Sequence, residues 1–323
     1  MNLLNVNEIK RLITETYKLE PIRIKKLRLG TINLSYLIET KSGKSVFRIY
    51  KRNNIKRQIE IEHKLITFLK EKNFPVANII KTINGKTLGH KNGLFFALFD
   101  FIAGRYLYKI NIRQLKSVAK LLGRYHFMVR RYDYPQKKEW WYVESIALEK
   151  YLKQAENLGA HHQLLFSLKC FIKLFRANTE INELKRLPHI FVHGDFSLRN
   201  LKFIGNKVSG VFDFDNIRKE LRIFDLVRPL QSIVGIGRYI NKNRIKIFFN
   251  EYLKTSQMLL SSLERRYLVE MFWIQHIKEA LWQLRQYLLS KRAIHFKCLK
   301  KEIKFLRWLD NNYCNLREIF ESL

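Results

Sequence analysis

The stretch VHGDFSLRNLKFIGNKVSGVFDFDN, residues 192–216, carries the strongest local signal in this chain. It places Asp195, Asn200 and Asp213 in order within one short segment, although only 28 of the 323 residues are Asp or Glu. Two interpretations are open for this segment. It is either a buried turn whose polar side chains satisfy one another, or a site that binds a metal ion and a nucleotide.

The segment after Asn200 predicts a β-hairpin. Two apolar runs, 201–204 and 208–214, flank a Gly-Asn pair, which supplies the positive φ angles of a tight turn. A hairpin returns the chain to its start, so Asp213, at the end of the second predicted strand, is expected beside Asn200. Carboxylate and carboxamide oxygens are hard ligands that suit Mg²⁺, which keeps its other positions for water and phosphate.

The residues before the hairpin predict a proton acceptor. Asp195 is expected close to the metal, where its carboxylate accepts the proton of a hydroxyl that attacks a phosphate. His193 is expected to brace this loop through a hydrogen bond rather than to act as the base.

The net charge of +33 is the most unusual feature of the composition. Such a charge attracts phosphate-rich partners. The Lys and Arg residues are spread along the whole chain, however, and accompany many Ile and Asn residues, as in sequences encoded by A/T-rich codons. A nucleic-acid or anionic-surface partner is therefore open but not favoured.

The remaining composition indicates a folded intracellular protein. Hydrophobic residues make up 47% of the chain, which excludes a disordered chain, and its three cysteines are scattered without metal-ligand spacing. No signal peptide or transmembrane segment is expected, because the longest apolar run, at 93–104, is too short to cross a bilayer. The expected location is the cytoplasm.

The first part of the chain alternates like a small sheet. The predicted elements are a helix at 7–19, strands at 22–29, 35–40 and 45–51, a helix at 56–72, and strands at 78–82 and 94–101. The rest predicts helices at 114–132, 145–158, 244–253, 263–289 and 298–313. We therefore expect an α+β protein with a small antiparallel-sheet lobe, residues 1–101, and a mainly helical lobe, residues 102–323.

The motifs HGDFSLRN and GVFDFD resemble those of the aminoglycoside phosphotransferase and choline kinase family, and their wording is closest to the homoserine-kinase-like branch. The resemblance implies a bilobal protein-kinase-like fold in which residues 1–101 bind nucleotide and residues 102–323 carry catalysis and the acceptor. It also implies an enzyme that uses ATP and Mg²⁺ to phosphorylate a hydroxyl group of a small molecule. Asp195 is then the catalytic base, and Asn200 and Asp213 are the metal ligands.

The same resemblance assigns nucleotide-binding residues in the first lobe. Gly30 lies in the expected phosphate loop, and Arg48 holds phosphates in the place of a lysine. Glu62 is the expected partner of Arg48, with Glu60 as a rival. Backbone groups of Asp100 and Ile102 are expected to pair with adenine.

Some residues depart from the family pattern. Ser197 stands where many relatives carry His or Lys, so Arg199 is left as a source of positive charge in this loop. Asp215 replaces a glycine and is expected either to contact a second metal or to face solvent. Asp225 matches a family position that steadies the loop.

Other functions remain as alternatives. A protein kinase is disfavoured because only a short segment separates Asp213 from Asp225 and because Gly194 replaces the arginine of the kinase loop. A non-enzymatic protein that binds polyanions through its basic surface is the other alternative. Among acceptors, an amino alcohol or a homoserine-like hydroxy amino acid is the first choice. An aminoglycoside stays possible because EWWYVE, at 139–144, offers an aromatic and acidic lining.

Overall fold

The computed structural model describes residues 4–27, 33–51, 56–132 and 140–323, and their side chains except those of residues 140–147. The backbone forms two compact units. Unit 1 comprises residues 1–107 and 199–215, and unit 2 comprises residues 108–198 and 216–323. The predicted division of function between residues 1–101 and 102–323 stays a prediction.

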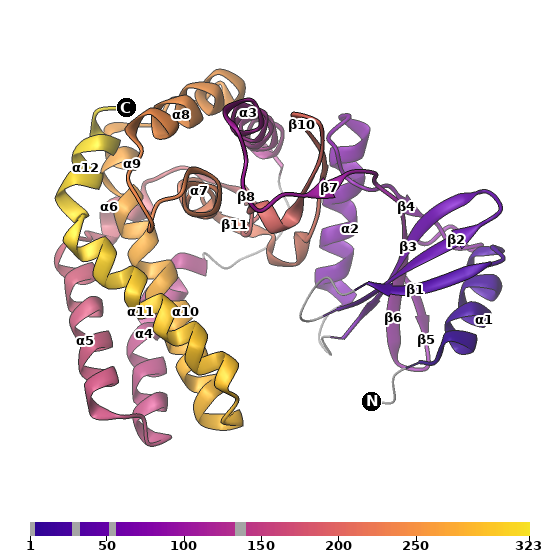
Figure 1. The fold of residues 1–323 in the computed structure, drawn as a ribbon, viewed down its shortest axis with the longest axis horizontal. Coiled ribbons are helices and arrows are strands. Elements are labelled where there is room, and N and C mark those ends of the chain that lie inside the picture. Colours follow the sequence, from indigo (N-terminus) through magenta and orange to yellow (C-terminus); the bar gives the residue numbers. More distant parts are fainter. Residues whose placement is uncertain (1–3, 28–32, 52–55, 133–139) are drawn as a thin grey trace. The chain divides into compact units, whose positions relative to one another are not determined.

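Unit 1 is built on a six-stranded antiparallel sheet (Figure 1). Its elements from the first part of the chain are α1 (Val6–Tyr17), β1 (Arg23–Leu27), β2 (Leu34–Thr40), β3 (Gly43–Tyr50), α2 (Lys56–Glu71), β4 (Ile79–Ile80), β5 (Gly89–Lys91), β6 (Leu94–Asp100) and β7 (Arg105–Tyr106). The strand order is β1-β2-β3-β6-β4, with β5 also paired to β6. This arrangement confirms the predicted antiparallel sheet with its two helices.

The alternating sequence of β2 and β3 explains how the sheet is covered. Tyr36 and Ile38 of β2 and Phe47 and Ile49 of β3 point into one apolar cluster. The buried face of α1, which carries Ile9, Leu12, Ile13 and Tyr17, closes this cluster. Arg48 lies between Phe47 and Ile49 and points to the opposite face, because successive side chains of a strand alternate. The sheet therefore buries its core on one side and presents Arg48 on the other.

The predicted hairpin is present in unit 1. It consists of β9 (Leu201–Ile204) and β10 (Lys207–Val211), which pair antiparallel and form a three-stranded sheet with β7. The second strand is shorter than predicted, because it ends at Val211 instead of continuing through Phe214. Asp213 has φ = 65°, a left-handed conformation that ends an extended strand, and a short 3₁₀ turn (Phe214–Asn216) follows.

Unit 2 is mainly helical, as predicted (Figure 1). Its elements are α3 (Ile112–Val129), α4 (Trp140–Asn157), α5 (His162–Ala177), α6 (Ile181–Lys185), β8 (His189–Val192), β11 (Arg218–Leu221), α7 (Phe224–Pro229), the π-helical turn η3 (Leu230–Val234), α8 (Lys242–Ser256), α9 (Ser262–Arg266), α10 (Leu268–Ser290), α11 (Ala293–Asn311) and α12 (Tyr313–Glu321). A second 3₁₀ turn, η1 (Leu198–Asn200), joins this part of the chain to the hairpin.

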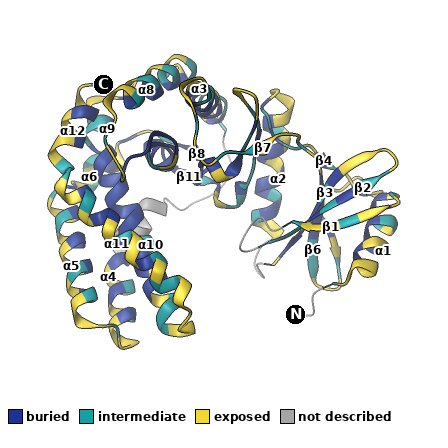
Figure 2. Ribbon diagram, viewed as in Figure 1, coloured by how far each residue is buried: buried dark blue, intermediate teal, exposed yellow. Residues whose placement is uncertain are grey.

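The core of unit 2 lies around α10 (Figure 2). This helix is buried along most of its first part and packs against α4, α5 and α11, whereas α3 packs along α8. The predicted helix at 263–289 is divided, since a capping box between Ser261 and Glu264 starts α9 and a new helix begins after Tyr267. Helices α5, α6, α7 and α12 were missed. No described helix is long and apolar enough to cross a bilayer.

Candidate active site

Arg48 organises a cluster of charged side chains in unit 1. Its guanidinium donates from Nη1 to Glu62 Oε1 of α2 at 3.1 Å. Nη2 donates to Asp215 Oδ1 at 2.7 Å and lies 3.7 Å from Asp213 Oδ1. The predicted pairing of Arg48 with Glu62 is confirmed, and the segment after the hairpin supplies two further carboxylates.

Asp215 has a role that the sequence did not predict. Its second oxygen accepts a hydrogen bond from Asn33 Nδ2 at 2.7 Å, and Asn33 Oδ1 in turn accepts from the backbone N–H of Lys51 at 3.2 Å. Asp215 is therefore not directed into solvent, and its expected contact with a second metal ion stays a prediction. It links the end of β3 to the hairpin and fixes the guanidinium of Arg48.

The cluster carries more negative than positive charge. Glu62, Asp213 and Asp215 surround a single guanidinium, and Glu62 is 3% exposed. Burial raises the pKa of Glu62; Arg48 opposes this shift, and the two aspartates add to it. Burial lowers the pKa of Arg48, but Asp215 and Glu62 outweigh it, so the guanidinium stays charged. The site therefore favours the arrival of another cation.

The hairpin returns the chain to Asn200 at Phe212, the residue before Asp213. The backbone N–H of Phe212 donates to the carbonyl of Asn200 at 2.9 Å, and Val211 pairs with Leu201. Asn200 is buried, whereas the Asp213 side chain is 39% exposed. The described residues contain no group of three or more His, Cys, Asp or Glu side chains able to hold a metal ion. Two protein ligands of this kind suit a cation that takes its remaining ligands from water and phosphate.

Backbone groups at the end of β6 and just after it, in Asp100 and Ile102, were predicted to pair with adenine. The backbone N–H of Asp100 donates to Asn78 O at 2.9 Å, and the carbonyl of Ile102 accepts from Lys202 Nζ at 2.8 Å. Those two groups are therefore occupied. The N–H of Ile102 has no hydrogen-bond acceptor within the described part of the chain, so it can serve a nucleobase.

Lys202 is a residue that the sequence did not single out. Its ammonium lies over the rings of Phe101, Tyr106 and Phe212, at 4.6, 5.6 and 5.4 Å from the ring centres. Burial lowers the pKa of Lys202. The sequence could have indicated this residue, because Lys202 lies between the apolar Leu201 and Phe203 in β9. Alternation along a strand turns its side chain away from the hairpin's apolar face.

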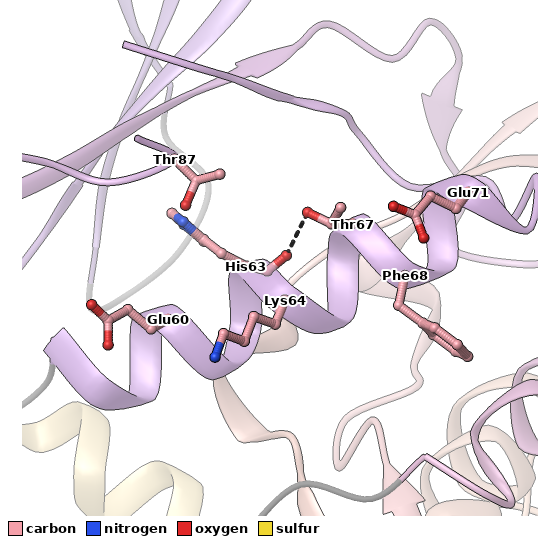
Figure 3. A pocket seen from close by; sticks show the side chains of 7 residues that line it. All are labelled: Glu60, His63, Lys64, Thr67, Phe68, Glu71 and Thr87. Atoms are coloured by element: carbon pink, nitrogen blue, oxygen red, sulfur yellow. Dashed lines mark hydrogen bonds between the residues drawn. The ribbon is translucent and has the colours of Figure 1, made fainter. Parts of the chain in front are cut away.

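A pocket of about 480 Å³ lies along another face of α2 (Figure 3). Its lining consists of Glu60, His63, Lys64, Thr67, Phe68, Glu71 and Thr87. Glu60 belongs to this pocket, and Lys56 lies 3.9 Å from it, so Glu60 is not the partner of Arg48. Glu60 and Glu62 are two residues apart, about half a turn of α2, so their side chains lie on different faces of the helix.

Asp195 lies in a tightly held loop of unit 2, directly after β8. Asp225 of α7 accepts hydrogen bonds from the backbone N–H groups of His193 and Gly194, both at 2.8 Å. His193 Nδ1 accepts from the N–H of Asp195 at 3.2 Å. The predicted bracing roles of His193 and Asp225 are confirmed.

Gly194 is required at its position in this loop. It adopts φ = 79°, and a Cβ atom there would lie 2.6 Å from the carbonyl oxygen of Asn216. With any other residue, the Cβ atom would clash with this backbone oxygen, and rotating a side chain would not remove the clash. This close approach explains why glycine occupies this position.

His126 completes the support of the loop from α3. Its Nε2 lies 3.1 Å from Asp225 Oδ2, and its Nδ1 lies 2.8 Å from the hydroxyl of Tyr252. Burial lowers the pKa of His126. Burial acts to raise the pKa of Asp225. The hydrogen bond and the charge interaction with His126, together with the backbone hydrogen bond and charge interaction with His193, have the larger effect, so the pKa of Asp225 is lowered. Asp225 therefore stays an anion that accepts every N–H donor aimed at it.

Arg228 is a second residue that the sequence missed. It follows Asp225 on α7, and its Nε lies 3.7 Å from Asp195 Oδ1. With its oxygen turned toward the guanidinium, the carboxamide of Gln275 accepts from Arg228 Nη2 at 3.1 Å and from Nε. The spacing of Asp225 and Arg228, three positions apart on one helix, was the only signal, because it places both on the loop's side of α7.

Two predicted features lie outside the described residues. Gly30 falls in the range 28–32, and the side chains of the EWWYVE segment, 139–144, are likewise not described.

The chain has a protein-kinase-like fold. The chain superimposes on a microcompartment-associated aminopropanol kinase with a TM-score of 0.74, at 14% identity over 97% of this chain and 98% of the other. It superimposes on the amicoumacin kinase hAmiN in complex with AMP-PNP, Ca²⁺ and Ami with a TM-score of 0.71, at 15% identity over 99% and 94% of the two chains. The predicted protein-kinase-like α+β fold is confirmed.

Sequence comparison identifies the family. The phosphotransferase enzyme family (APH) matches residues 23–238, and the chain belongs to this family. It is 23% identical to the homoserine kinase of Methylobacillus flagellatus over 228 residues, which cover 69% of this chain and 67% of that enzyme. The chain thus spans about two thirds of the length of this curated relative. The predicted class, a small-molecule kinase, is confirmed.

Proposed function

We propose that this chain transfers the γ-phosphate of ATP to the hydroxyl group of a small amino alcohol or hydroxy amino acid of homoserine type. The observation that carries the proposal is the cluster in which Glu62 and Asp215 hold Arg48 beside the Asn200–Asp213 hairpin. The named activities of the similar proteins, homoserine kinase and aminopropanol kinase, support this acceptor class. The complex of the amicoumacin kinase with AMP-PNP and Ca²⁺ supports the use of ATP and a divalent cation, which we take to be Mg²⁺.

Unit 1 is proposed to bind the nucleotide. Arg48, fixed by two carboxylates, offers its guanidinium to the α- and β-phosphates through charge-assisted hydrogen bonds. The N–H of Ile102 and the carbonyl of Asp100 are proposed to face adenine. Gly30 is proposed to contribute backbone N–H groups to the phosphates.

Asn200 and Asp213 are proposed to hold the divalent cation. The donor set fits Mg²⁺, since both ligands are hard oxygens and the excess of carboxylates around Arg48 offsets a divalent charge. When bound, the ion would neutralise charge on the phosphate oxygens.

Asp195 is proposed to act on the acceptor. Its carboxylate orients the acceptor hydroxyl and takes its proton as the oxygen bonds to the γ-phosphorus and the bond from that phosphorus to the ADP oxygen breaks. The products are the phosphate ester and ADP. His193, Gly194 and Asp225 act only through Asp195, since they fix the loop that carries it.

The alternatives have less support. Between Asp213 and Asp225 the chain forms a 3₁₀ turn, β11 and the start of α7, so this segment holds no long activation loop for a protein substrate. A non-enzymatic polyanion-binding protein would not need the ordered contacts around both Arg48 and Asp195.

A screen of alcohols tests the proposal. Purified protein, ATP and Mg²⁺ are incubated with homoserine, 3-aminopropan-1-ol, choline and an aminoglycoside, and ADP formation is followed. ADP release that depends on Mg²⁺ and on one of the small amino-bearing alcohols supports the proposal. If no alcohol raises ADP formation above the rate without acceptor, the proposed function is wrong.

A further inference from the structure

We propose that Arg228 binds a carboxylate of the acceptor, so that the substrate is a hydroxy amino acid and not a simple amino alcohol. This inference rests on the proposed function, because it concerns the acceptor phosphorylated beside Asp195. It adds a carboxylate subsite to the second unit and narrows the acceptor class.

The position of Arg228 relates it to the acceptor rather than to the fold. Its Nε lies 3.7 Å from Asp195 Oδ1, so the guanidinium stands beside the carboxylate that is proposed to act on the acceptor. Asp195 is almost fully buried, with 6% of its side chain exposed, whereas 27% of the Arg228 side chain is exposed. The guanidinium is therefore held at the buried carboxylate while part of it stays accessible to a ligand.

Gln275 of α10 prepares Arg228 for such a ligand. Its carboxamide oxygen accepts from Nε and Nη2, and Gln275 itself is only 6% exposed. Two hydrogen bonds from a buried partner fix the plane of the guanidinium, which lowers the cost of ordering it when a ligand binds.

The outer edge of the guanidinium keeps its donors. Arg228 has no bond from Nη1 to any oxygen of the described residues, and one of the two N–H groups of Nη2 suffices for Gln275. A parallel pair of N–H donors on Nη1 and Nη2 is the geometry that recognises a carboxylate with two hydrogen bonds. A cationic group of the substrate, such as an ammonium, has no lone pair that could accept from these donors.

This charge selects among the acceptors. Polycationic aminoglycosides would be repelled by a guanidinium next to the reacting hydroxyl. A simple amino alcohol lacks the group that Arg228 recognises, whereas homoserine carries it. One competing role exists for Arg228, since Ser197 cannot supply the positive charge that relatives place in this loop, and Arg228 could contact the transferred phosphate instead.

Two acceptors that differ only in the carboxylate separate these roles. Homoserine and 3-aminopropan-1-ol share the primary hydroxyl, the amine and the chain between them. The experiment measures kcat/KM for both with the wild-type chain, with Arg228→Gln, with Arg228→Lys and with the control Arg285→Gln, which changes an exposed arginine on α10. Thermal unfolding of each variant confirms that it is folded.

The wild-type chain is expected to prefer homoserine. Arg228→Gln should reduce the ratio of kcat/KM for homoserine over 3-aminopropan-1-ol by roughly a hundredfold to a thousandfold, mainly through KM, because two charge-assisted hydrogen bonds are lost. Arg228→Lys should restore part of the ratio, and Arg285→Gln should not change it.

Equal losses for both acceptors in Arg228→Gln would overturn the proposal and assign Arg228 to the phosphate. A wild-type chain that uses 3-aminopropan-1-ol as well as homoserine would overturn it while leaving the proposed kinase activity intact. If no alcohol is phosphorylated, the proposed function itself fails and the carboxylate subsite fails with it.

Discussion

Asp225→Asn should destabilise unit 2 and reduce activity together, although Asp225 touches neither substrate in the proposed reaction. The side chain accepts from the backbone N–H groups of His193 and Gly194 and contacts His126, at 2.8, 2.8 and 3.1 Å. Asparagine has the same shape, but one of its two terminal atoms is a donor. At least one buried N–H then faces another N–H instead of an oxygen.

The size of the effect follows from these contacts. Leaving one buried donor without an acceptor costs about 1–3 kcal/mol, and the remaining bonds lose the strength that a charged acceptor gives them. We therefore expect the free energy of unfolding to fall by roughly 2–4 kcal/mol. Asp225 is 1% exposed, so water cannot replace the lost acceptor.

Urea unfolding followed by circular dichroism measures this change. The matched control is Asp310→Asn, an exposed aspartate on α11 of the same unit, which should change stability by no more than about 0.5 kcal/mol. If Asp225→Asn changed stability no more than Asp310→Asn does, the loop would not depend on this carboxylate.

The remaining predictions concern unit 1. Arg48→Ala leaves three carboxylates without their cation, so it should lower the free energy of unfolding by roughly 3–5 kcal/mol and weaken ATP binding. The control Arg23→Ala, at the exposed edge of the sheet, should lower it by under about 1 kcal/mol. Equal urea midpoints for the two variants would contradict this prediction. Burial, followed by the charge of Arg48, lowers the pKa of His63 from 6.5 to about 3, so the unfolded chain binds a proton below pH 6.5 that the folded chain does not. Stability should therefore fall as pH decreases from 6.5 toward 3, by up to about 1.4 kcal/mol per pH unit from this group, and His63→Gln should remove that slope in urea unfolding measured at several pH values. Asp213→Asn keeps a residue type that tolerates the left-handed conformation, so calorimetry should show a folded protein whose ATP affinity no longer rises with Mg²⁺; an unchanged Mg²⁺ effect would refute the metal assignment.

The hairpin shows how much of the site the sequence could predict. A Gly-Asn turn between two apolar runs determines local pairing, so the return of the chain to Asn200 just before Asp213 followed from short-range rules. The end of the strand at Val211 could not be predicted in this way, because an aspartate in the left-handed region has no distinct sequence signal. Likewise, alternation in β3 placed Arg48 on one face of the sheet and helical spacing separated Glu60 from Glu62.

Contacts between distant segments explain what sequence reasoning missed. Asp215 and Asn33 are 182 positions apart, and only the folded sheet brings them to Arg48. Arg228 and Gln275 meet because α10 packs against α7. Such pairs depend on tertiary packing, which neither composition nor local periodicity encodes.

The most direct test of phosphotransfer is to detect the phosphorylated acceptor itself. The wild-type chain is incubated with ATP, Mg²⁺ and homoserine, and the product is identified by phosphorus NMR beside an Asp195→Asn variant whose ATP affinity is measured separately. We expect a phosphate ester with the wild-type chain, and with Asp195→Asn near-normal ATP binding but a rate lower by about a hundredfold or more, as for loss of a general base. Retained turnover in Asp195→Asn, or ATP binding by the wild-type chain with no phosphorylated product from any alcohol, would contradict the account.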